Sequence, residues 1–312
     1  MIYLLIVVSN MATGLGLFLL GMKFLTNGLK EVTSSRLSYA IRNLKIHPIL
    51  GIAIGILTTA LLQSSSGTTI IIVGLVEANL LNLYQAAAII MGANIGTTLT
   101  AQLIAFQPSR YVFIPLMIGL FLSLHKTNRR LRFFGEIFMG FALLFIGIDL
   151  LSKGVSPLAS LVRFQEILLE FGTKPILGVI LGFCTTAIIQ SSSTGIAILQ
   201  SLATNHLISL TAAIAILLGQ NIGTCVTTLL ASIHLTSIGK RAALIHILFN
   251  LWGVVLMFPF IEILCRLSIT LSPINPARQI ANAHSIFNVF STIIFLPFIP
   301  LFVKLSTLMV RD

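Results

Sequence analysis

Two short polar runs interrupt apolar stretches of this sequence. Residues 63–66 read Gln-Ser-Ser-Ser directly after GIAIGILTTALL, and residues 190–193 read the same after TTAII. Serine hydroxyls and glutamine amides donate hydrogen bonds to anionic oxygens, and their own oxygens are ligands for hard cations. A helix that begins at such a run also presents free N–H groups and a positive dipole end. The two QSSS runs therefore predict an ion site suited to an oxyanion.

A second polar motif follows each run. Residues 92–100 read GANIGTTLT, and residues 219–227 read GQNIGTCVT. Asparagine and threonine supply neutral oxygens, and kinks at the glycines are expected to free backbone carbonyls. Such an all-oxygen set suits Na⁺. The predicted ligands in these NIGT motifs are Asn94, Thr97, Thr98, Asn221 and Thr224.

No fixed charge accompanies these motifs. Residues 51–69, 92–100, 178–195 and 219–227 contain no Lys, Arg, Asp or Glu. A doubly charged anion buried there without a counter-charge would be very costly. Bound cations can supply the balance, and each ion then raises the affinity for the other. The neutral polar motifs therefore predict cotransport of an anion with cations.

The chain contains two copies of one unit. When Gln63 is aligned with Gln190, residues 51–66 match residues 178–193 at 9 of 16 positions without a gap. The same alignment places the two NIGT motifs over each other. Three glycines of the first apolar segment also recur in the second copy, as Gly14 and Gly140, Gly21 and Gly147, and Gly28 and Gly154.

This repetition predicts the domain organisation. Repeat 1 comprises residues 1–125 and repeat 2 residues 126–265, each with a transmembrane helix, a QSSS hairpin, a NIGT helix and a second transmembrane helix. Residues 266–312 form a C-terminal transmembrane helix and tail.

The composition is that of an integral membrane protein. Hydrophobic residues make up 56% of the 312 residues, charged residues only 9%, and the mean hydropathy is +1.04. Soluble domains carry about 25% charged residues. Apolar stretches of about 20 residues, enough to cross a bilayer, recur along the chain. The net charge of +11 comes from short loops, which indicates orientation signals rather than nucleic-acid binding.

The loop charges favour inverted repeats. One basic cluster lies between the first helix and the first QSSS segment and another near the repeat junction, and both face the same side if residues 48–79 dip into the membrane and return as a re-entrant hairpin. The fold class is then an all-α polytopic protein whose two inverted repeats bring both QSSS tips to the midplane. The N-terminus is expected outside the plasma (inner) membrane and the C-terminus inside. Inside lie Lys30, Arg36, Arg42, Lys45, Lys126, Arg129, Arg130, Arg132, Lys240, Arg241, Lys304 and Arg311; outside lie Arg110, Lys153, Arg163, Lys174, Arg266 and Arg278.

Four other polar residues lie in apolar segments. Lys23 and Asp149 occupy equivalent positions in the two repeats, which allows an ion pair between them or two unrelated charges near helix ends. His246 and His284 each have Phe and Asn at the third and fourth positions after them, on one helix face. We favour interhelical packing and hydrogen bonding over proton transfer for both histidines.

The paired QSSS and GxNIGT motifs resemble those of the type II sodium–phosphate cotransporter family. The stretch ALIHILFN (243–250) also resembles that family's His-x-x-Phe-Asn motif, and the similarity covers residues 14–298. The resemblance implies cotransport of inorganic phosphate with Na⁺, inward across the plasma membrane. It implies phosphate contacts from Gln63, Ser64, Ser65, Ser66, Gln190, Ser191, Ser192 and Ser193. It adds Ser65, Ser66, Thr68, Ser192, Ser193 and Thr194 to the sodium ligands.

Three alternatives remain at this point. Sulfate, arsenate or a small carboxylate can replace phosphate in a cradle of hydroxyls and helix dipoles. An anion channel needs no alternating access and is compatible with the same hairpins. A serine hydrolase would use Ser66 or Ser193 with His246 or His284, but the GxSxG context is absent and duplicated serines have no role in it. We expect no enzyme activity and no cofactor, with Na⁺ as the coupling ion.

Overall fold

The computed structural model describes residues 2–42, 47–106, 111–125 and 128–311. Within them the structure is helical and contains no strand, so the all-α prediction is confirmed. Of the predicted loop charges, Lys45, Arg110 and Lys126 lie outside the described residues. The helices are α1 (Ile2–Arg42), α2 (Pro48–Leu62), α3 (Ser65–Glu77), α4 (Leu83–Ile104), α5 (Phe113–Ser123), α6 (Arg129–Val155), η1 (Ser156–Ser160), α7 (Val162–Thr173), α8 (Pro175–Ile189), α9 (Ser192–Thr204), α10 (Leu210–Ser232), α11 (Ser237–Met257), η2 (Phe258–Phe260), α12 (Ile261–Leu271), α13 (Pro276–Phe295), η3 (Leu296–Phe298) and α14 (Ile299–Met309).

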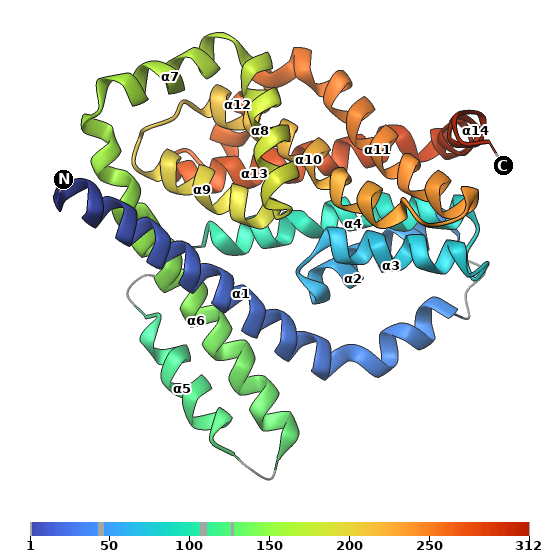
Figure 1. The fold of residues 1–312 in the computed structure, drawn as a ribbon, viewed down its shortest axis with the longest axis horizontal. Coiled ribbons are helices and arrows are strands. Elements are labelled where there is room, and N and C mark those ends of the chain that lie inside the picture. The colour runs from blue at the N-terminus through green and yellow to red at the C-terminus, as the bar shows by residue number, and fades with distance from the viewer. Residues whose placement is uncertain (1, 43–46, 107–110, 126–127, 312) are drawn as a thin grey trace.

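Six segments of the described chain are long and apolar enough to cross a membrane. Helices α4 and α10 are the most buried of them and lie at the centre of the molecule (Figure 1). The two chain ends lie at opposite ends of the long axis. The protein is therefore a multi-pass membrane protein. The segments are Ile6–Leu29, Leu83–Ile104, Arg129–Leu158, Leu210–Ser232, Ser237–Leu271 and Pro276–Met309.

Helix α1 is longer than the charge pattern predicts. It continues to Arg42 through residues expected to form a loop, because residues 30–42 contain neither glycine nor proline to end it.

The glycines shared by the two first helices form their contact surface. Helices α1 and α6 run antiparallel side by side, as Figure 1 shows. A Cβ added to Gly14 would lie 2.8 Å from the Gly147 carbonyl oxygen, and one added to Gly21 would lie 2.7 Å from that of Gly140. Small residues let helices approach closely in membranes, where packing rather than water exclusion drives association.

Close approach at glycines also joins each hairpin to its NIGT helix. Helices α2 and α3 form one helical hairpin and α8 and α9 another; α2 packs on α4, and α8 on α10. A Cβ added to Gly55 would overlap the Ile89 carbonyl oxygen, and one added to Gly182 would overlap that of Ile216. The glycines of the NIGT helices make the same contact from the other side. A Cβ added to Gly92 would overlap the Ile52 carbonyl oxygen of α2, and one added to Gly219 would overlap the Val179 carbonyl oxygen of α8.

These contacts correct one expectation. Helix α4 runs unbroken through GANIGT and α10 through GQNIGT, so the expected glycine kinks do not free backbone carbonyls. The glycines serve close helix packing instead. The motifs therefore offer their side-chain oxygens as cation ligands.

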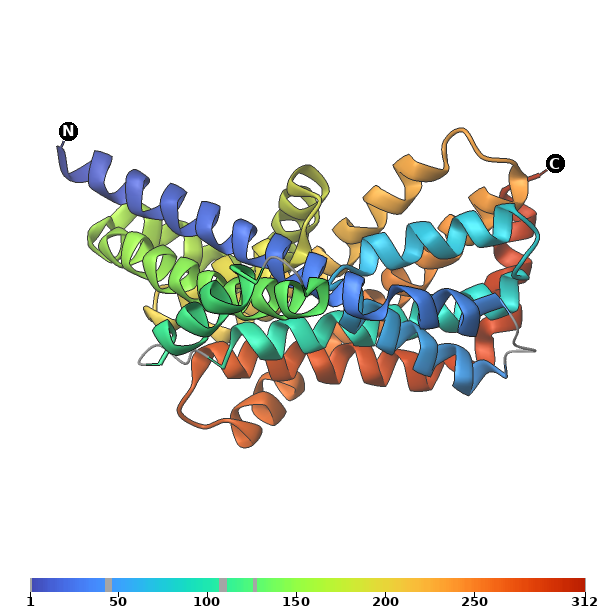
Figure 2. The same cartoon turned by 90° about the horizontal axis from the view of Figure 1, so that it is seen from below.

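Two proline-containing breaks divide the last two spans. Helices α11 and α12 flank η2, and α13 and α14 flank η3. Proline removes a helical hydrogen bond and kinks the chain. Helix α12 packs against α13 and α14 packs against α11, so the two broken spans run antiparallel (Figure 2).

The far end of the first hairpin is anchored by a carboxylate. The Thr236 backbone N–H and hydroxyl donate to the two oxygens of Glu77 at 3.0 and 2.9 Å. Donation from the Thr236 backbone lowers the pKa of this carboxyl below its ordinary value. The contact ties the end of α3 to the start of α11.

Substitution of a packing glycine should destabilise the fold. Gly92→Ala places a methyl group against the Ile52 carbonyl, which forces α2 away from α4. We expect a loss of about 1–3 kcal/mol in the free energy of unfolding, seen as a lower thermal midpoint in detergent. Gly74→Ala is the matched control, because no atom lies within 4 Å of its new Cβ. Equal midpoints for the two variants would contradict the packing role of Gly92.

Candidate functional site

Each hairpin turns at its glutamine. Gln63 ends α2 with φ of 50°, and Gln190 ends α8 with φ of 57°. This left-handed conformation costs most side chains about 1–2 kcal/mol, and glycine or asparagine usually occupies it. Both turns nevertheless carry the larger amide side chain. The backbone strain at both tips therefore points to a use for that amide.

The first serine of each run caps the second helix of its hairpin. The Ser64 hydroxyl accepts a hydrogen bond from the Gly67 N–H at 3.0 Å, and the Ser191 hydroxyl accepts one from the Thr194 N–H at 3.3 Å. Such caps stabilise a helix by about 1 kcal/mol. Because Ser64 uses only a lone pair for this contact, its proton remains available to an anion.

The other four serines occupy the first turns of α3 and α9. Ser65 and Ser66 begin α3, and Ser192 and Ser193 begin α9. The backbone N–H groups of a first turn have no partner within the helix, and the helix dipole places positive potential there. Two helix N-termini with hydroxyl side chains therefore surround the space between the tips.

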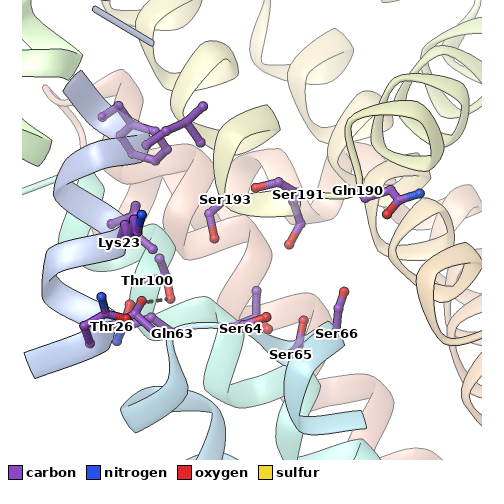
Figure 3. A pocket seen from close by; sticks show the side chains of 16 residues that line it. Lys23, Thr26, Gln63, Ser64, Ser65, Ser66, Thr100, Gln190, Ser191 and Ser193 are labelled. Atoms are coloured by element: carbon purple, nitrogen blue, oxygen red, sulfur yellow. Dashed lines mark hydrogen bonds between the residues drawn. The ribbon is translucent and has the colours of Figure 1, made fainter. Parts of the chain in front are cut away.

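The two tips line one cavity of about 310 Å³. All eight QSSS residues contribute to its wall, and Figure 3 shows Ser191 and Ser193 of the second tip across the space from Ser64, Ser65 and Ser66 of the first. The volume falls within the range of small-molecule sites. The tertiary structure thus brings together all eight residues predicted for the oxyanion, although the two runs belong to different repeats.

The first helix closes one side of this cavity with polar residues that the motif analysis did not assign. Lys23, Thr26 and Asn27 of α1 belong to the lining. Among the described residues of the lining, Lys23 is the one that is charged, and it forms no ion pair with Asp149, which pairs with Lys153 at 2.7 Å. The feature of the sequence that could have indicated this contribution of α1 is Lys23, a single lysine within an otherwise apolar segment.

The two glutamines are held differently. The Gln63 oxygen accepts a hydrogen bond from Thr100 at 3.0 Å (Figure 3), and its amide donates to the Ala60 carbonyl. Gln190 has no side-chain hydrogen bond to another described residue, so its amide is free to bind a ligand. Thr100, the last residue of GANIGTTLT, also lines the cavity and was not predicted.

A second, much smaller cavity lies behind the tips. Its volume of about 10 Å³ is close to that of one water-sized probe, which suits a single small ion. The Thr97 and Thr224 hydroxyls donate to helix carbonyls at 3.2 and 2.9 Å, so their lone pairs remain free. The buried Gln220 side-chain oxygen has no partner among the described residues. The polar lining is Ser65, Asn94, Thr97, Ser192, Gln220, Asn221, Thr224 and His284.

Five predicted sodium ligands lie outside this small cavity. Ser66 and Ser193 line the larger one. Thr68 bonds to Thr59 at 3.0 Å across the first hairpin, and Thr194 bonds to Ser191 at 2.8 Å. Thr98 donates to the Ile95 carbonyl at 2.7 Å. Ser66 also approaches Thr227 of α10 at 3.4 Å, which joins the first tip to the second NIGT helix.

The His-x-x-Phe-Asn motifs hold the NIGT asparagines. Asn94 of α4 donates to Asn250 of α11 at 3.1 Å. Asn221 of α10 accepts from Asn288 of α13 at 3.5 Å and lies 3.3 Å from the Nε2 atom of His284. Each asparagine near the small cavity is therefore oriented by a side chain from another span.

The histidines act in interhelical hydrogen bonding, in agreement with the interpretation we favoured. The Nδ1 atom of His246 lies 3.2 Å from the Thr228 hydroxyl. Neither His246 nor His284 has a hydrogen bond to a QSSS serine within the described chain. The described residues also contain no group of three or more His, Cys, Asp or Glu residues that could hold a metal ion.

Comparison with known proteins identifies the family. The model of the Na⁺/Pi-cotransporter family matches residues 17–153 and 149–272. "Uncharacterized protein YqeW" of Bacillus subtilis is 34% identical over 266 residues, which are 85% of this chain and 86% of the relative. No solved structure matches.

Two further relatives have names that refer to phosphate. "Putative inorganic phosphate export protein YjbB" of Escherichia coli (strain K12) is 26% identical over 258 residues, 82% of this chain and 47% of that protein. The chain thus spans about half the length of that relative. "Sodium-dependent phosphate transport protein 2B" of Homo sapiens is 49% identical over 61 residues, 20% of this chain and 9% of that protein.

The family match covers both QSSS runs and both NIGT motifs, and the B. subtilis relative extends over most of the chain. This multi-pass membrane protein belongs to the Na⁺/Pi-cotransporter family.

Proposed function

We propose that the protein is a sodium-coupled transporter of inorganic phosphate that binds the anion and Na⁺ together between its two QSSS tips. The observation that carries this proposal is the single cavity that all eight QSSS residues line. Family membership and the names of two relatives support phosphate as the anion.

The larger cavity is the proposed phosphate site. The N-termini of α3 and α9 supply N–H groups and positive dipole ends, and the QSSS hydroxyls and amides supply further donors. Lys23 supplies a positive charge from α1. A tetrahedral oxyanion with four oxygens can accept from several of these donors at once.

The small cavity is the proposed site of one Na⁺. Its neutral oxygens come from Ser65, Asn94, Thr97, Ser192, Asn221 and Thr224, all of them predicted ligands, and Gln220 adds a buried oxygen without a partner among the described residues. Because Ser65 and Ser192 border both cavities, the anion and the cation would be held by the same two helix starts. Attraction between the bound ions then couples their affinities.

Transport follows from an inverted arrangement of the two repeats. We propose that each QSSS hairpin is re-entrant, that the tips meet near the midplane, and that the repeats rock about the site to expose it on either side. In this topology the N-terminus lies outside the plasma membrane and the C-terminus inside. Under an inward sodium gradient the coupled flux of phosphate is inward.

The alternatives are less well supported by the geometry. A channel does not require a cation cavity that shares two serines with the anion site. A hydrolase requires a histidine bonded to a serine, which the tips lack in the described structure. Other tetrahedral oxyanions fit the same donors, and export is suggested by the name of the E. coli relative. Competition by arsenate and sulfate, and uptake measured with the sodium gradient reversed, separate these cases.

Uptake of radiolabelled phosphate into proteoliposomes tests the central proposal. We expect accumulation with Na⁺ outside and none with K⁺. The double variant Gln190→Ala/Ser191→Ala should lose at least tenfold in uptake, because donors to an anion contribute about 1.5–3 kcal/mol each. The control Gln279→Ala/Ser272→Ala changes the same residue types away from both cavities. Absence of sodium-dependent uptake by folded wild-type protein would refute the proposed substrate or coupling.

Lys23 should set the affinity for the anion. We expect Lys23→Gln to raise the KM for phosphate about tenfold by removing a nearby charge, with a smaller effect on kcat. Lys23→Arg keeps the charge and should remain within about threefold of wild type. Asp149→Asn, at the equivalent position in repeat 2, should leave the KM unchanged because Asp149 does not line the cavity. An unchanged KM in Lys23→Gln would show that the lysine does not act on the anion.

Two threonines distinguish the proposed sodium site from its surroundings. Thr224→Val keeps the shape but removes an oxygen from the small cavity, and should raise the Na⁺ concentration for half-maximal uptake about fivefold. Thr98→Val is the matched control, since the Thr98 hydroxyl bonds to its own helix outside the cavity. If Thr98→Val alone shifts the sodium dependence, the proposed position of Na⁺ is wrong.

A further inference from the structure

The two broken spans at the C-terminal end carry a second internal correspondence, which appears when His246 is aligned with His284. In this alignment Phe249 and Asn250 recur as Phe287 and Asn288. The correspondence continues without a gap into the breaks, where Pro259 of η2 is matched by Pro297 of η3.

A groove lined by apolar side chains lies beside each break. The first has a volume of about 250 Å³ and is lined by Phe260 and by residues of α11, α12 and α13; the second has about 230 Å³ and is lined by Phe298 and by residues of α11, α13 and α14. Five residues that line the first groove align with five that line the second. The pairs are Met257 and Phe295, Phe260 and Phe298, Ile263 and Leu301, Leu264 and Phe302, and Leu267 and Leu305. Phe290 of α13 also lines the first groove and Trp252 of α11 the second, and these two residues are equivalent in the alignment; Ile286 of α13 lines the first groove only. The same concave surface is therefore built twice.

Both grooves open to the outside of the protein. Ile263 and Leu267 in the first are 55% and 47% exposed, and Leu301 and Trp252 in the second are both 47% exposed. In a membrane protein such apolar walls face lipid, and acyl chains are the apolar material present there. A hydrocarbon chain in the groove supplies van der Waals contacts to the lining side chains, which would otherwise have no partner atoms on that side.

Each broken span carries a cationic residue next to its groove, at equivalent positions of the alignment. Arg266 precedes the lining residue Leu267, and Lys304 precedes Leu305, so the two cations are equivalent in the same alignment. Both cations are exposed, and neither has an ion pair within the described chain. Glu262, one turn before Arg266, makes no ion pair with it there. A positive charge beside an apolar groove complements a lipid with an anionic headgroup.

The two sites lie at opposite ends of the span pair. Helix α12 lies beside one end of α13, and α14 continues from the other end (Figure 2). The distribution of basic residues predicts that Arg266 is outside and Lys304 inside. One site therefore belongs to each leaflet of the membrane.

We propose that these two grooves are binding sites for anionic phospholipids, one per leaflet, with an acyl chain in the groove and the phosphate at Arg266 or Lys304. The proposal does not depend on which ion is transported. Through Asn250 and Asn288, the lipid-bearing spans contact the NIGT asparagines. Lipid bound at the breaks would therefore stabilise the helices that orient Asn94 and Asn221.

Trp252 provides a direct test because it is the one tryptophan in the sequence and lines the second groove. Its fluorescence is measured in vesicles that contain brominated phosphatidylglycerol or brominated phosphatidylcholine, whose bromines quench tryptophan on contact. We expect the anionic lipid to displace the zwitterionic one with a relative binding constant of about five, as a single basic residue near the headgroups provides. Lys304→Gln should reduce this preference to about one, whereas Arg266→Gln should leave it unchanged at Trp252.

The reciprocal measurement reports on the first groove. In the variant Trp252→Phe/Phe290→Trp the reporter moves to the equivalent position, and Arg266→Gln, not Lys304→Gln, should then abolish the preference. A monodisperse elution profile and an unchanged emission maximum establish that each variant is folded. Equal quenching by the two lipids, or a preference insensitive to both substitutions, would overturn the proposal.

Discussion

The candidate site depends on the close approach of each hairpin to its NIGT helix. Gly55 and Gly92 let α2 lie directly on α4, and Gly182 and Gly219 do the same for α8 and α10. A short hairpin that carries four polar residues at its tip is stable in an apolar setting only if its tip is surrounded by protein or lines a watery cavity. These backbone contacts hold each hairpin on its NIGT helix and so determine where the QSSS residues meet.

Neutral oxygens and helix termini then form a site with little fixed charge. The NIGT side chains face the tips, and asparagines from α11 and α13 hold them in place. In the proposed site an anion and a cation would stabilise each other, because Lys23 is the one charged side chain among the described residues that line the two cavities. In the proposed site Lys23, on α1 outside both hairpins, would add a positive charge to this balance. A single charge at the border of the cavity can attract the anion without replacing the cation as its partner.

The spans that carry His246 and His284 correspond to each other in sequence. These last two spans do more than cover the core. Their intact halves carry the residues that orient Asn94 and Asn221, while their broken halves carry the apolar grooves. Proline breaks cost helical hydrogen bonds, and two breaks at matched positions produce two matched concavities. The candidate ion site and the two apolar grooves are thus connected through single helices.

The sequence alone determined the membrane class, the all-α fold, the duplication and the identity of the QSSS and NIGT motifs. These follow from composition and from repeats in which polar residues stand out against an apolar background. Only the tertiary structure decided that the glycines pack helices instead of kinking them, that Lys23 faces the cavity while Asp149 pairs with Lys153, and that six of eleven predicted sodium ligands share one small cavity. The physical reason is that motif spacing specifies which residues lie near one another along a helix, whereas the side of the helix that meets a partner depends on how closely the two backbones pack.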